Sequence, residues 1–208
     1  MNTATRSLKF IIISAFSLIM LSCSLGSSEG TVEDIDGNSY RTIRIGKQIW
    51  MAENLKATTF NDGKPIPIVT DGPEWYNLTA AAYSWYNNDS IAFSDPYGAL
   101  YNYHAINTGK LCPPGWRVPT QQDFQTLISV LDPDADFVRH EVSTIAGGLL
   151  KASRTDAWSD TNTVTINDHG FTALPGGCRS WAGNFSMINT IGYYGSSTNN
   201  SSLSIRSA

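Results

Sequence analysis

Residues 112–124 read CPPGWRVPTQQDF, a stretch that bends the chain and then starts a helix. Two prolines and a glycine at positions 113–115 favour a bend, and Pro119 keeps the residue before it extended. Thr120 fits the N-cap of a helix, because Asp123 follows three residues later and completes a capping-box pattern. The stretch is therefore first of all a folding signal.

The predicted helix continues from Thr120 to Leu131. Its apolar side chains recur at i, i+3, i+4 and i+7, which is the spacing of one helix face. These side chains are Phe124, Leu127, Ile128 and Leu131. Asp132-Pro133 ends the helix, and a weaker helix, interrupted by two glycines, is expected in residues 141–153.

Residues 32–55 predict a three-stranded meander. Asp36-Gly37-Asn38 is a turn signal, and the following strand places Ile43 and Ile45 on one face and Tyr40, Thr42 and Arg44 on the other. Gly46-Lys47 fits a two-residue hairpin, with glycine at the first central position, where φ must be positive.

Other parts of the chain give weaker signals. Residues 78–86 fit a short helix or a strand equally well, residues 95–98 predict a turn, and residues 99–105 predict a strand. The segments 170–185 and 191–198 are interpreted as short strands joined by glycine turns.

The N-terminus has the pattern of an export signal. Arg6 and Lys9 precede a 12-residue apolar stretch at 10–21, which is short for a membrane span but suits a secretory signal. It ends in Met-Leu-Ser-Cys, which resembles a bacterial lipobox with Cys23 as the lipid attachment site. We expect residues 1–22 to be a lipoprotein signal peptide and residues 23–31 a flexible tether. The predicted location is the bacterial cell envelope, anchored in the outer membrane, with the face left open.

Charge and residue pattern exclude several classes of function. Without residues 1–22 the chain would carry 12 basic and 18 acidic side chains, a net charge of −6, and it has no basic run, which argues against a nucleic-acid partner. The three histidines lack metal-ligand spacing. Asp132, Asp134 and Asp136 imitate the start of a calcium loop, but Phe137 and Ser143 stand where glycine and glutamate are needed. We therefore expect no metal, no cofactor and no catalytic residues.

Six segments in order resemble the Fibrobacter succinogenes major paralogous domain, a family of bacterial, often lipid-anchored, domains. These segments are DIDGNSYRTIRIGKQIWMAENL, YGALYNYHA, CPPGWRVPTQQDF, AGGLLK, GFTALPGGCR and GYYGSST. The resemblance runs from about Val32 to Thr198 and implies one domain over residues 32–208. It further implies an α+β, C-type lectin-like fold with a twisted, mainly antiparallel sheet, one or two helices and long loops. The family has no generally assigned catalytic activity.

The chain departs from the family pattern at two cysteines. Family members continue into closing strands whose cysteine is the expected partner of Cys112, whereas this chain ends at SSLSIRSA. The resemblance therefore implies a domain that lacks C-terminal strands. Cys178 stands where the family usually has an aromatic residue, so that either the two cysteines form a replacement disulfide or both are buried thiols.

The expected function is a lipid-anchored binding or adhesion module without catalytic activity, whose ligand is a glycan or a protein. By analogy with related receptors, the candidate ligand-binding residues are Trp181, Asn184, Tyr193 and Tyr194. Two alternatives stay open: a structural spacer of the envelope, and an enzyme related to formylglycine-generating oxidases, which would need an active cysteine pair.

Overall fold

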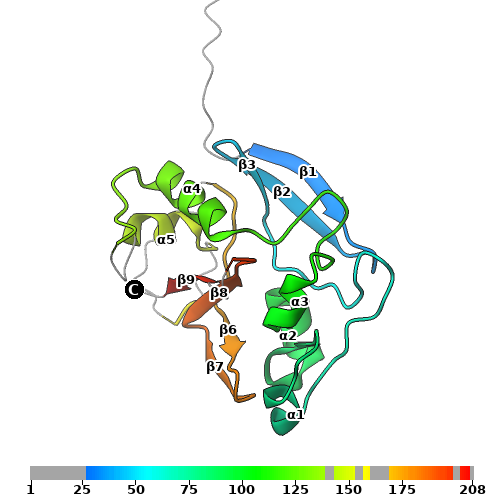
Figure 1. The fold of residues 1–208 in the computed structure, drawn as a ribbon. Coiled ribbons are helices and arrows are strands. Elements are labelled where there is room, and N and C mark those ends of the chain that lie inside the picture. Colours follow the sequence, from blue (N-terminus) through cyan, green and yellow to red (C-terminus); the bar gives the residue numbers. More distant parts are fainter. Residues whose placement is uncertain (1–26, 139–142, 153–156, 160–168, 199–201, 207–208) are drawn as a thin grey trace, which may run out of the picture.

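The structure is a computed structural model that describes residues 27–138, 143–152, 157–159, 169–198 and 202–206 (Figure 1). Within these residues the fold is α+β, with nine strands in three small sheets and five α-helices. The expected mixed class with mainly antiparallel strands is confirmed. The expectation of one sheet with one or two helices is wrong, since the strands separate into three sheets and short helices occupy the connections.

The first sheet is an antiparallel meander, as predicted. It contains β1 (Ser27–Glu33), β2 (Ser39–Ile45) and β3 (Gln48–Met51) in the order β1-β2-β3. Gly46 joins β2 to β3 with φ +59°, and a Cβ at this position would lie 2.8 Å from a methyl group of Val130.

The flexible tether predicted at residues 23–31 extends too far, because strand β1 already begins at Ser27. Residues 27–31 are part of the strand, because their backbone groups pair with β2 and the carboxylate of Glu29 accepts a hydrogen bond from Arg44 at 2.8 Å. The pairing shifts register between Ser28 and Gly30. Both faces of β2 carry buried side chains. Ile43 and Ile45 are buried on one face, and Tyr40 and Thr42 are buried on the other.

The middle of the chain forms short elements around a two-stranded sheet. In chain order they are α1 (Gly72–Tyr76), β4 (Tyr83–Ser84), the 3-10 helix η1 (Tyr86–Asn88), α2 (Ser90–Tyr97), β5 (Leu100–Tyr101) and α3 (Tyr103–Asn107). The strand predicted at 99–105 is therefore only two residues long. Asn102 ends it, because its side chain accepts a hydrogen bond from the Ala105 amide and caps α3. The turn predicted at 95–98 is the end of α2.

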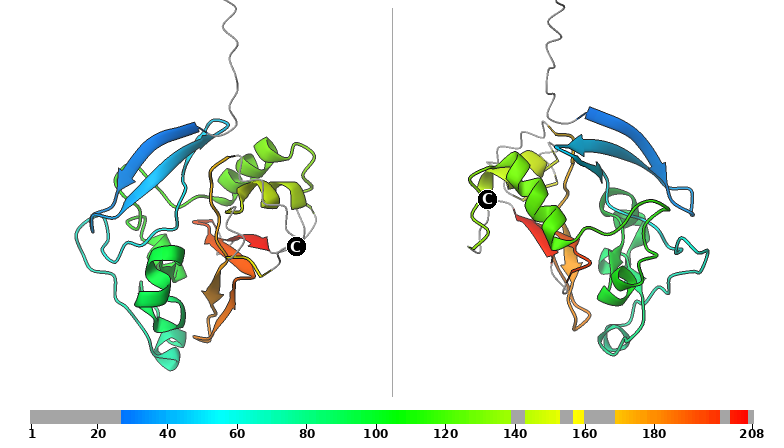
Figure 2. Two further views of the ribbon diagram at one scale, coloured as in Figure 1. Left: turned by 180° about the vertical axis from the view of Figure 1, so that it is seen from behind. Right: turned by 45° about the horizontal axis from the view of Figure 1, so that its top comes forward.

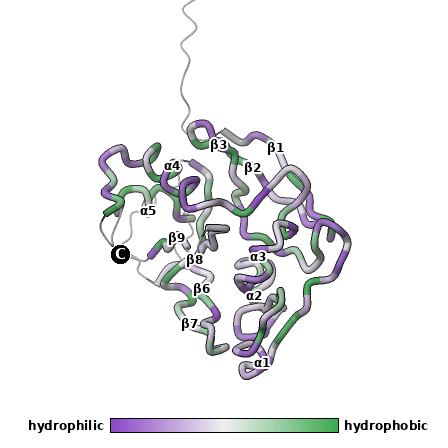
Figure 3. The backbone as a smooth tube through the Cα atoms, in the orientation of Figure 1, coloured by the Kyte–Doolittle hydropathy of each residue, from purple (hydrophilic) through white to green (hydrophobic). Residues whose placement is uncertain are grey.

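Helix α4 (Gln121–Leu131) is the predicted helix, and α5 (Thr144–Leu150) follows it. Thr120 and Asp123 form the predicted capping box, and all four residues of the predicted apolar stripe are buried. Figure 3 shows the alternation of hydrophilic and hydrophobic residues along α4.

The last sheet contains β6 (Gly176–Arg179), β7 (Phe185–Ile188), β8 (Ile191–Gly195) and β9 (Ser202–Arg206) in the order β7-β6-β8-β9. β6 and β8 are parallel, and the other pairs are antiparallel. The chain was expected to lack closing strands beyond residue 198, but residues 202–206 form β9, because Ile205 reaches the core and the backbone pairs with β8.

Three hydrophobic clusters hold the described residues together, the smallest of which contains Val69, Trp75 and Ala82. The largest cluster joins α4 and α5 to β2 and β9, and its centre includes Ile45, Leu127, Leu150, Phe171 and Ile205. The second lies among the short middle elements and contains Phe60, Ile66, Tyr83, Trp85 and Leu111. The views in Figure 2 show α4, α5 and the β6–β9 sheet on one side of the molecule and α1–α3 on the other, with β1–β3 at one end. Among the described residues, we find no helix with the length and hydropathy of a membrane span.

Candidate functional site

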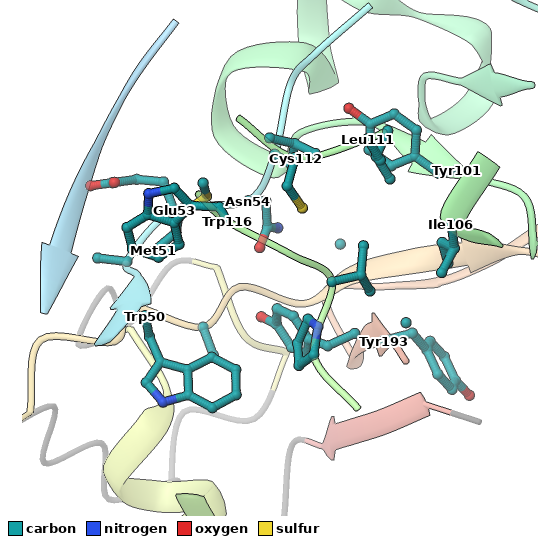
Figure 4. Close-up of a pocket in the computed structure, with 18 of the residues that line it drawn as sticks. Trp50, Met51, Glu53, Asn54, Tyr101, Ile106, Leu111, Cys112, Trp116 and Tyr193 are labelled. Atoms are coloured by element: carbon teal, nitrogen blue, oxygen red, sulfur yellow. The ribbon is translucent and has the colours of Figure 1, made fainter. Parts of the chain in front are cut away.

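A cavity of about 460 Å³ lies where these three parts of the fold meet (Figure 4). Its wall comes from residues 48–55, which are β3 and the chain that follows, from parts of residues 97–124, and from β6, β8 and the residues before β6. The stretch CPPGWRVPTQQDF contributes much of the wall, including Cys112, Trp116, Arg117 and Phe124. The folding signal at 112–124 therefore also builds a site.

One side of the cavity is a row of aromatic rings. Trp50 stacks on Phe124 with ring centroids 5.7 Å apart and an interplanar angle of 20°. The row continues through two edge-on contacts. The ring centroids of Trp50 and Phe171 lie 6.0 Å apart, and those of Phe171 and Tyr194 lie 6.2 Å apart. Because each ring packs against the next, this side is firmly positioned and predominantly apolar.

The opposite side carries Tyr101, Ile106, Leu111 and Cys112 (Figure 4). The Tyr101 hydroxyl donates a hydrogen bond to the carbonyl of Ala57 at 2.7 Å, and burial raises its pKa well above the ordinary value. The Cys112 sulfur points toward the cavity, and burial raises the pKa of this thiol to about 11. The Cys112 thiol is therefore protonated at neutral pH and a weak nucleophile.

The charged residues of the wall are paired. Glu53 accepts hydrogen bonds from the backbone and side chain of Arg41, at 2.7 and 2.6 Å. Asp123 accepts two hydrogen bonds from the guanidinium of Arg117, at 2.5 and 2.8 Å, and the pKa of its carboxyl lies well below the usual range because of Arg117 and Thr120. The described wall therefore presents ion pairs rather than isolated charges.

Two side-chain amides, Gln48 and Asn54, line the wall, and hydrogen bonding fixes that of Asn54. The Nδ2 of Asn54 donates a hydrogen bond to the carbonyl of Tyr97 at 2.8 Å, which fixes the side chain. Gly98 lies against the same segment with φ +72°, and a Cβ there would be 2.7 Å from the carbonyl oxygen of Leu55. The chain can approach Asn54 this closely because position 98 has no side chain.

Residues 43–208 match the family model of the Fibrobacter succinogenes major domain. The chain belongs to this family. The match contains every residue that lines the cavity, so the cavity is a feature of the major domain itself. No curated protein and no solved structure matches the chain.

The four candidate binding residues of the major domain fall in two places. Tyr193 and Tyr194 line the cavity. The Tyr194 hydroxyl donates a hydrogen bond to the Leu174 carbonyl at 3.2 Å and accepts one from its amide at 3.0 Å, so that its role is to hold the wall. Tyr193 is 38% exposed, and its hydroxyl points away from the cavity (Figure 4).

Trp181 and Asn184 lie outside the residues that line the cavity. Both are exposed in the turn between β6 and β7, and the Trp181 ring rests on Tyr76 of α1 with centroids 5.2 Å apart. The turn is tied to α1 by Arg179, which lies over the Trp75 ring at 4.2 Å and donates a hydrogen bond to the carbonyl of Thr70 at 3.0 Å. The structure therefore divides the four candidates between the cavity and the β6–β7 turn, and their role in binding stays a prediction.

Cys112 and Cys178 are free thiols in the described part of the major domain, so the possible disulfide between them is not formed. Cys112 lies in the cavity wall, whereas Cys178 lies in β6 with its sulfur 3.6 Å from the Ser186 hydroxyl of β7. The two cysteines thus occupy different environments. The predicted lipid site, Cys23, lies outside the described residues.

The acidic residues after α4 make local hydrogen bonds. Asp132 accepts hydrogen bonds from the Ser143 hydroxyl at 2.6 Å and from the Asp134 amide at 3.2 Å. Asp136 accepts one from the Val138 amide at 2.9 Å. Within the described ranges of the major domain, no group of three or more His, Cys, Asp or Glu side chains is placed to hold a metal ion.

Sequence reasoning missed most of the cavity of the major domain. Trp50 and Asn54 belong to the segment that carried the family resemblance, and Trp116 belongs to the opening stretch, but nothing in their spacing indicated that they meet. The available signal was composition: both segments hold tryptophan beside polar residues.

Proposed function

We propose that this major domain is a lipid-anchored module of the bacterial cell envelope that binds a ligand in the cavity and catalyses no reaction. The cavity is the main observation that supports this proposal. Its volume of about 460 Å³ falls within the roughly 300–1,000 Å³ typical of ligand sites. Apolar rings dominate its wall, and a few fixed polar groups accompany them, which is the usual composition of such sites.

The proposal includes a C-type lectin-like arrangement as the finer description of the α+β fold. Helix α4 follows the CPPGWRVPTQQDF stretch and packs beside a mainly antiparallel sheet, and the long connections between elements supply much of the cavity wall. These features support the arrangement that the family resemblance implies. Cys23 would carry the lipid, and the ligand would be a glycan or a protein, as the sequence suggested.

The state of the cysteines favours binding over catalysis. An oxidase of the formylglycine-generating type would need an active cysteine pair, whereas Cys112 and Cys178 are free, the first in the connection before α4 and the second in β6. Burial also raises the pKa of Cys112 to about 11, so that the thiol in the cavity is a weak nucleophile.

The anchor is tested by metabolic labelling with a palmitate analogue. We expect the wild-type chain to be labelled and the Cys23→Ala chain to stay unlabelled. Equal labelling of both chains would contradict the lipid attachment at Cys23.

Ligand binding is tested with the mature chain on a glycan array and in a pulldown from envelope extracts. The Cys112→Phe variant places a ring in the cavity, and Trp181→Ala removes an exposed ring elsewhere as the control. We expect ligand retention by the wild type and the control and its loss in Cys112→Phe. If all three proteins retain nothing, or retain the same molecules equally, the cavity is not the binding site and the spacer hypothesis is favoured.

A further inference from the structure

The charges of the cavity wall restrict what can enter it. Among the described lining residues, the charged side chains are Glu53, Arg117 and Asp123, and each is in an ion pair. Asp123 also accepts hydrogen bonds at Oδ2 from the backbone amide and hydroxyl of Thr120, at 2.7 and 2.6 Å, while its Oδ1 accepts one from Arg117. An anionic ligand would have to break one of these pairs or lie unpaired beside electron-rich ring faces, which is costly. A cationic ligand would gain from the ring faces, but both carboxylates of the described wall are already paired with arginine. The wall therefore favours an uncharged group.

The shape and chemistry of the wall favour an aromatic ring. The row of Phe124, Trp50, Phe171 and Tyr194 offers successive ring faces and edges, and aromatic rings pack on such surfaces in stacked or edge-on geometry. Across the cavity, Leu111 and Ile106 provide aliphatic surface, and Met51 adds a polarizable thioether at the border (Figure 4). The volume of about 460 Å³ exceeds that of a single ring, so part of the molecule that carries the ring also fits.

Asn54 offers a free acceptor to a ligand, and two further polar atoms of the wall, Gln48 Oε1 and Trp50 Nε1, are buried without a hydrogen-bond partner among the described residues. Asn54 uses its Nδ2 to donate to the Tyr97 carbonyl, and its Oδ1 accepts no hydrogen bond from the residues that the structure describes. Its side chain lies at the cavity beside Cys112 (Figure 4). Since the amide is held by Tyr97, the Oδ1 position is fixed before any ligand arrives, which favours a ligand with a hydrogen-bond donor.

We propose that the group bound in this cavity is an uncharged aromatic ring with a hydrogen-bond donor, as in a phenol or an indole. The inference rests on the proposed binding function and names the chemistry that the site takes. Such a ring is available from a free small molecule or from a tyrosine or tryptophan side chain of a peptide, and the two sources share the same contacts: the aromatic row for the ring and Asn54 for the donor.

A matched series of probes tests this proposal by ligand-observed NMR on the mature chain, residues 23–208 with Cys23→Ser. The probes are 4-methylphenol, its donor-free analogue 4-methylanisole, the anion 4-methylbenzoate and the cation 4-methylbenzylammonium. N-acetyltyrosinamide represents the peptide source. We expect 4-methylphenol to bind, the two ions to bind at least about tenfold more weakly, and 4-methylanisole to bind about 2- to 10-fold more weakly through the loss of one hydrogen bond. Binding of the tyrosine amide at least as tight as that of 4-methylphenol assigns the peptide source, and weaker binding assigns the small molecule.

Two measurements place the probe in the cavity. The Cys112→Phe variant should lose 4-methylphenol, whereas Ile91→Ala, which changes a side chain of α2 that is 96% exposed and outside the cavity lining, should bind it as the wild type does. The second measurement uses the wild-type protein and therefore does not depend on whether a variant folds. In the wild type, 4-methylphenol should slow the alkylation of Cys112 by N-ethylmaleimide. If 4-methylphenol binds without slowing the alkylation, the proposed location is wrong.

The outcomes separate this inference from the proposed function. Equal binding of the phenol and either ion overturns the uncharged class, and equal binding of the phenol and the anisole overturns the donor. If no probe binds while Cys112→Phe still abolishes ligand retention in the pulldown, the inference fails and cavity binding stands. If no probe binds and Cys112→Phe retains the ligand, both fail.

Discussion

Replacing Asp123 by asparagine is the sharpest test of how the CPPGWRVPTQQDF stretch holds the fold. The Asp123 carboxylate accepts hydrogen bonds from the Thr120 amide at 2.7 Å, from the Thr120 hydroxyl at 2.6 Å and from Arg117 at 2.5 and 2.8 Å. Asparagine keeps one acceptor oxygen but loses the charge, so the capping box is weakened and the ion pair is lost.

The magnitude follows from these contacts. A helix cap contributes about 1 kcal/mol to the free energy of unfolding. The ion pair adds roughly 0.5–1 kcal/mol and no more, because the Arg117 side chain is 65% exposed and solvent screens it. Asp123→Asn should therefore cost about 1–2 kcal/mol, which corresponds to a decrease in Tm of roughly 2–8 °C for a chain of this size.

The effect should depend on pH in a defined direction. The folded state holds the pKa of Asp123 well below its usual range, so the carboxylate stabilises the fold above the unfolded pKa of about 4. This contribution begins to decline as the pH falls below about 4 and is lost only as the pH falls through the lowered pKa of the folded state. Urea unfolding followed by tryptophan fluorescence at pH 7 and pH 3 should show a gap between wild type and Asp123→Asn that shrinks at the lower pH.

The control for this test is Arg117→Gln, which removes the ion pair and leaves the capping box. It should cost less than Asp123→Asn at pH 7. An Asp123→Asn protein as stable as the wild type at pH 7, or a gap that is unchanged at pH 3, would refute the reasoning.

The remaining predictions concern the core, a turn, an exposed ring and the cavity thiol. Leu127 is fully buried in the largest cluster, and Leu127→Ala should lower the free energy of unfolding by about 2–5 kcal/mol in the same urea assay. Gly183→Ala should lower it by more than about 1 kcal/mol, because φ is +85° and the new Cβ would lie 2.6 Å from the Cα of Gly72; a silent substitution would argue against this turn. Trp181→Ala should change stability by less than about 0.5 kcal/mol, since the side chain is 76% exposed, and a larger loss on thermal melting would reveal a structural role. Alkylation of Cys112 should accelerate with rising pH up to about 11, whereas a rate that levels off near pH 9 would contradict the buried thiol.

Local signals in the sequence were sufficient for some elements of this fold. The capping pattern at Thr120 and the 3.6-residue spacing that follows define α4, and both depend on residues within one helix. Gly46 predicted the hairpin between β2 and β3 because a positive φ at that place nearly requires glycine. Such features can be found without knowing what else the chain contacts.

Other features depend on contacts between distant residues, and local patterns missed them. Trp50 follows Gln48 in a short strand, yet its environment is set by Phe124 and Phe171, which lie more than 70 residues away. Residues 99–105 divide into β5 and α3 because Asn102 caps the helix. The aromatic residues around Asn102 favoured the prediction of a strand, so the capping signal was missed. The cavity could not be predicted from local patterns either, because its wall comes from segments that lie far apart in the sequence and meet only in the folded chain.

The early start of β1 has a geometric consequence for an anchored protein. If Cys23 carries a lipid, three residues lie between it and the first residue of β1 at Ser27, and the distance from Cys23 to Ser27 is at most about 14 Å. The stand-off between the bilayer and the start of β1 would then be this short, so the β1–β2 end would lie near the lipid headgroups. The β6–β7 turn and α1 lie at the far end (Figure 1) and would be the part presented to the surrounding space. Under this geometry, a partner arriving from solution would meet Trp181 and Tyr76 first.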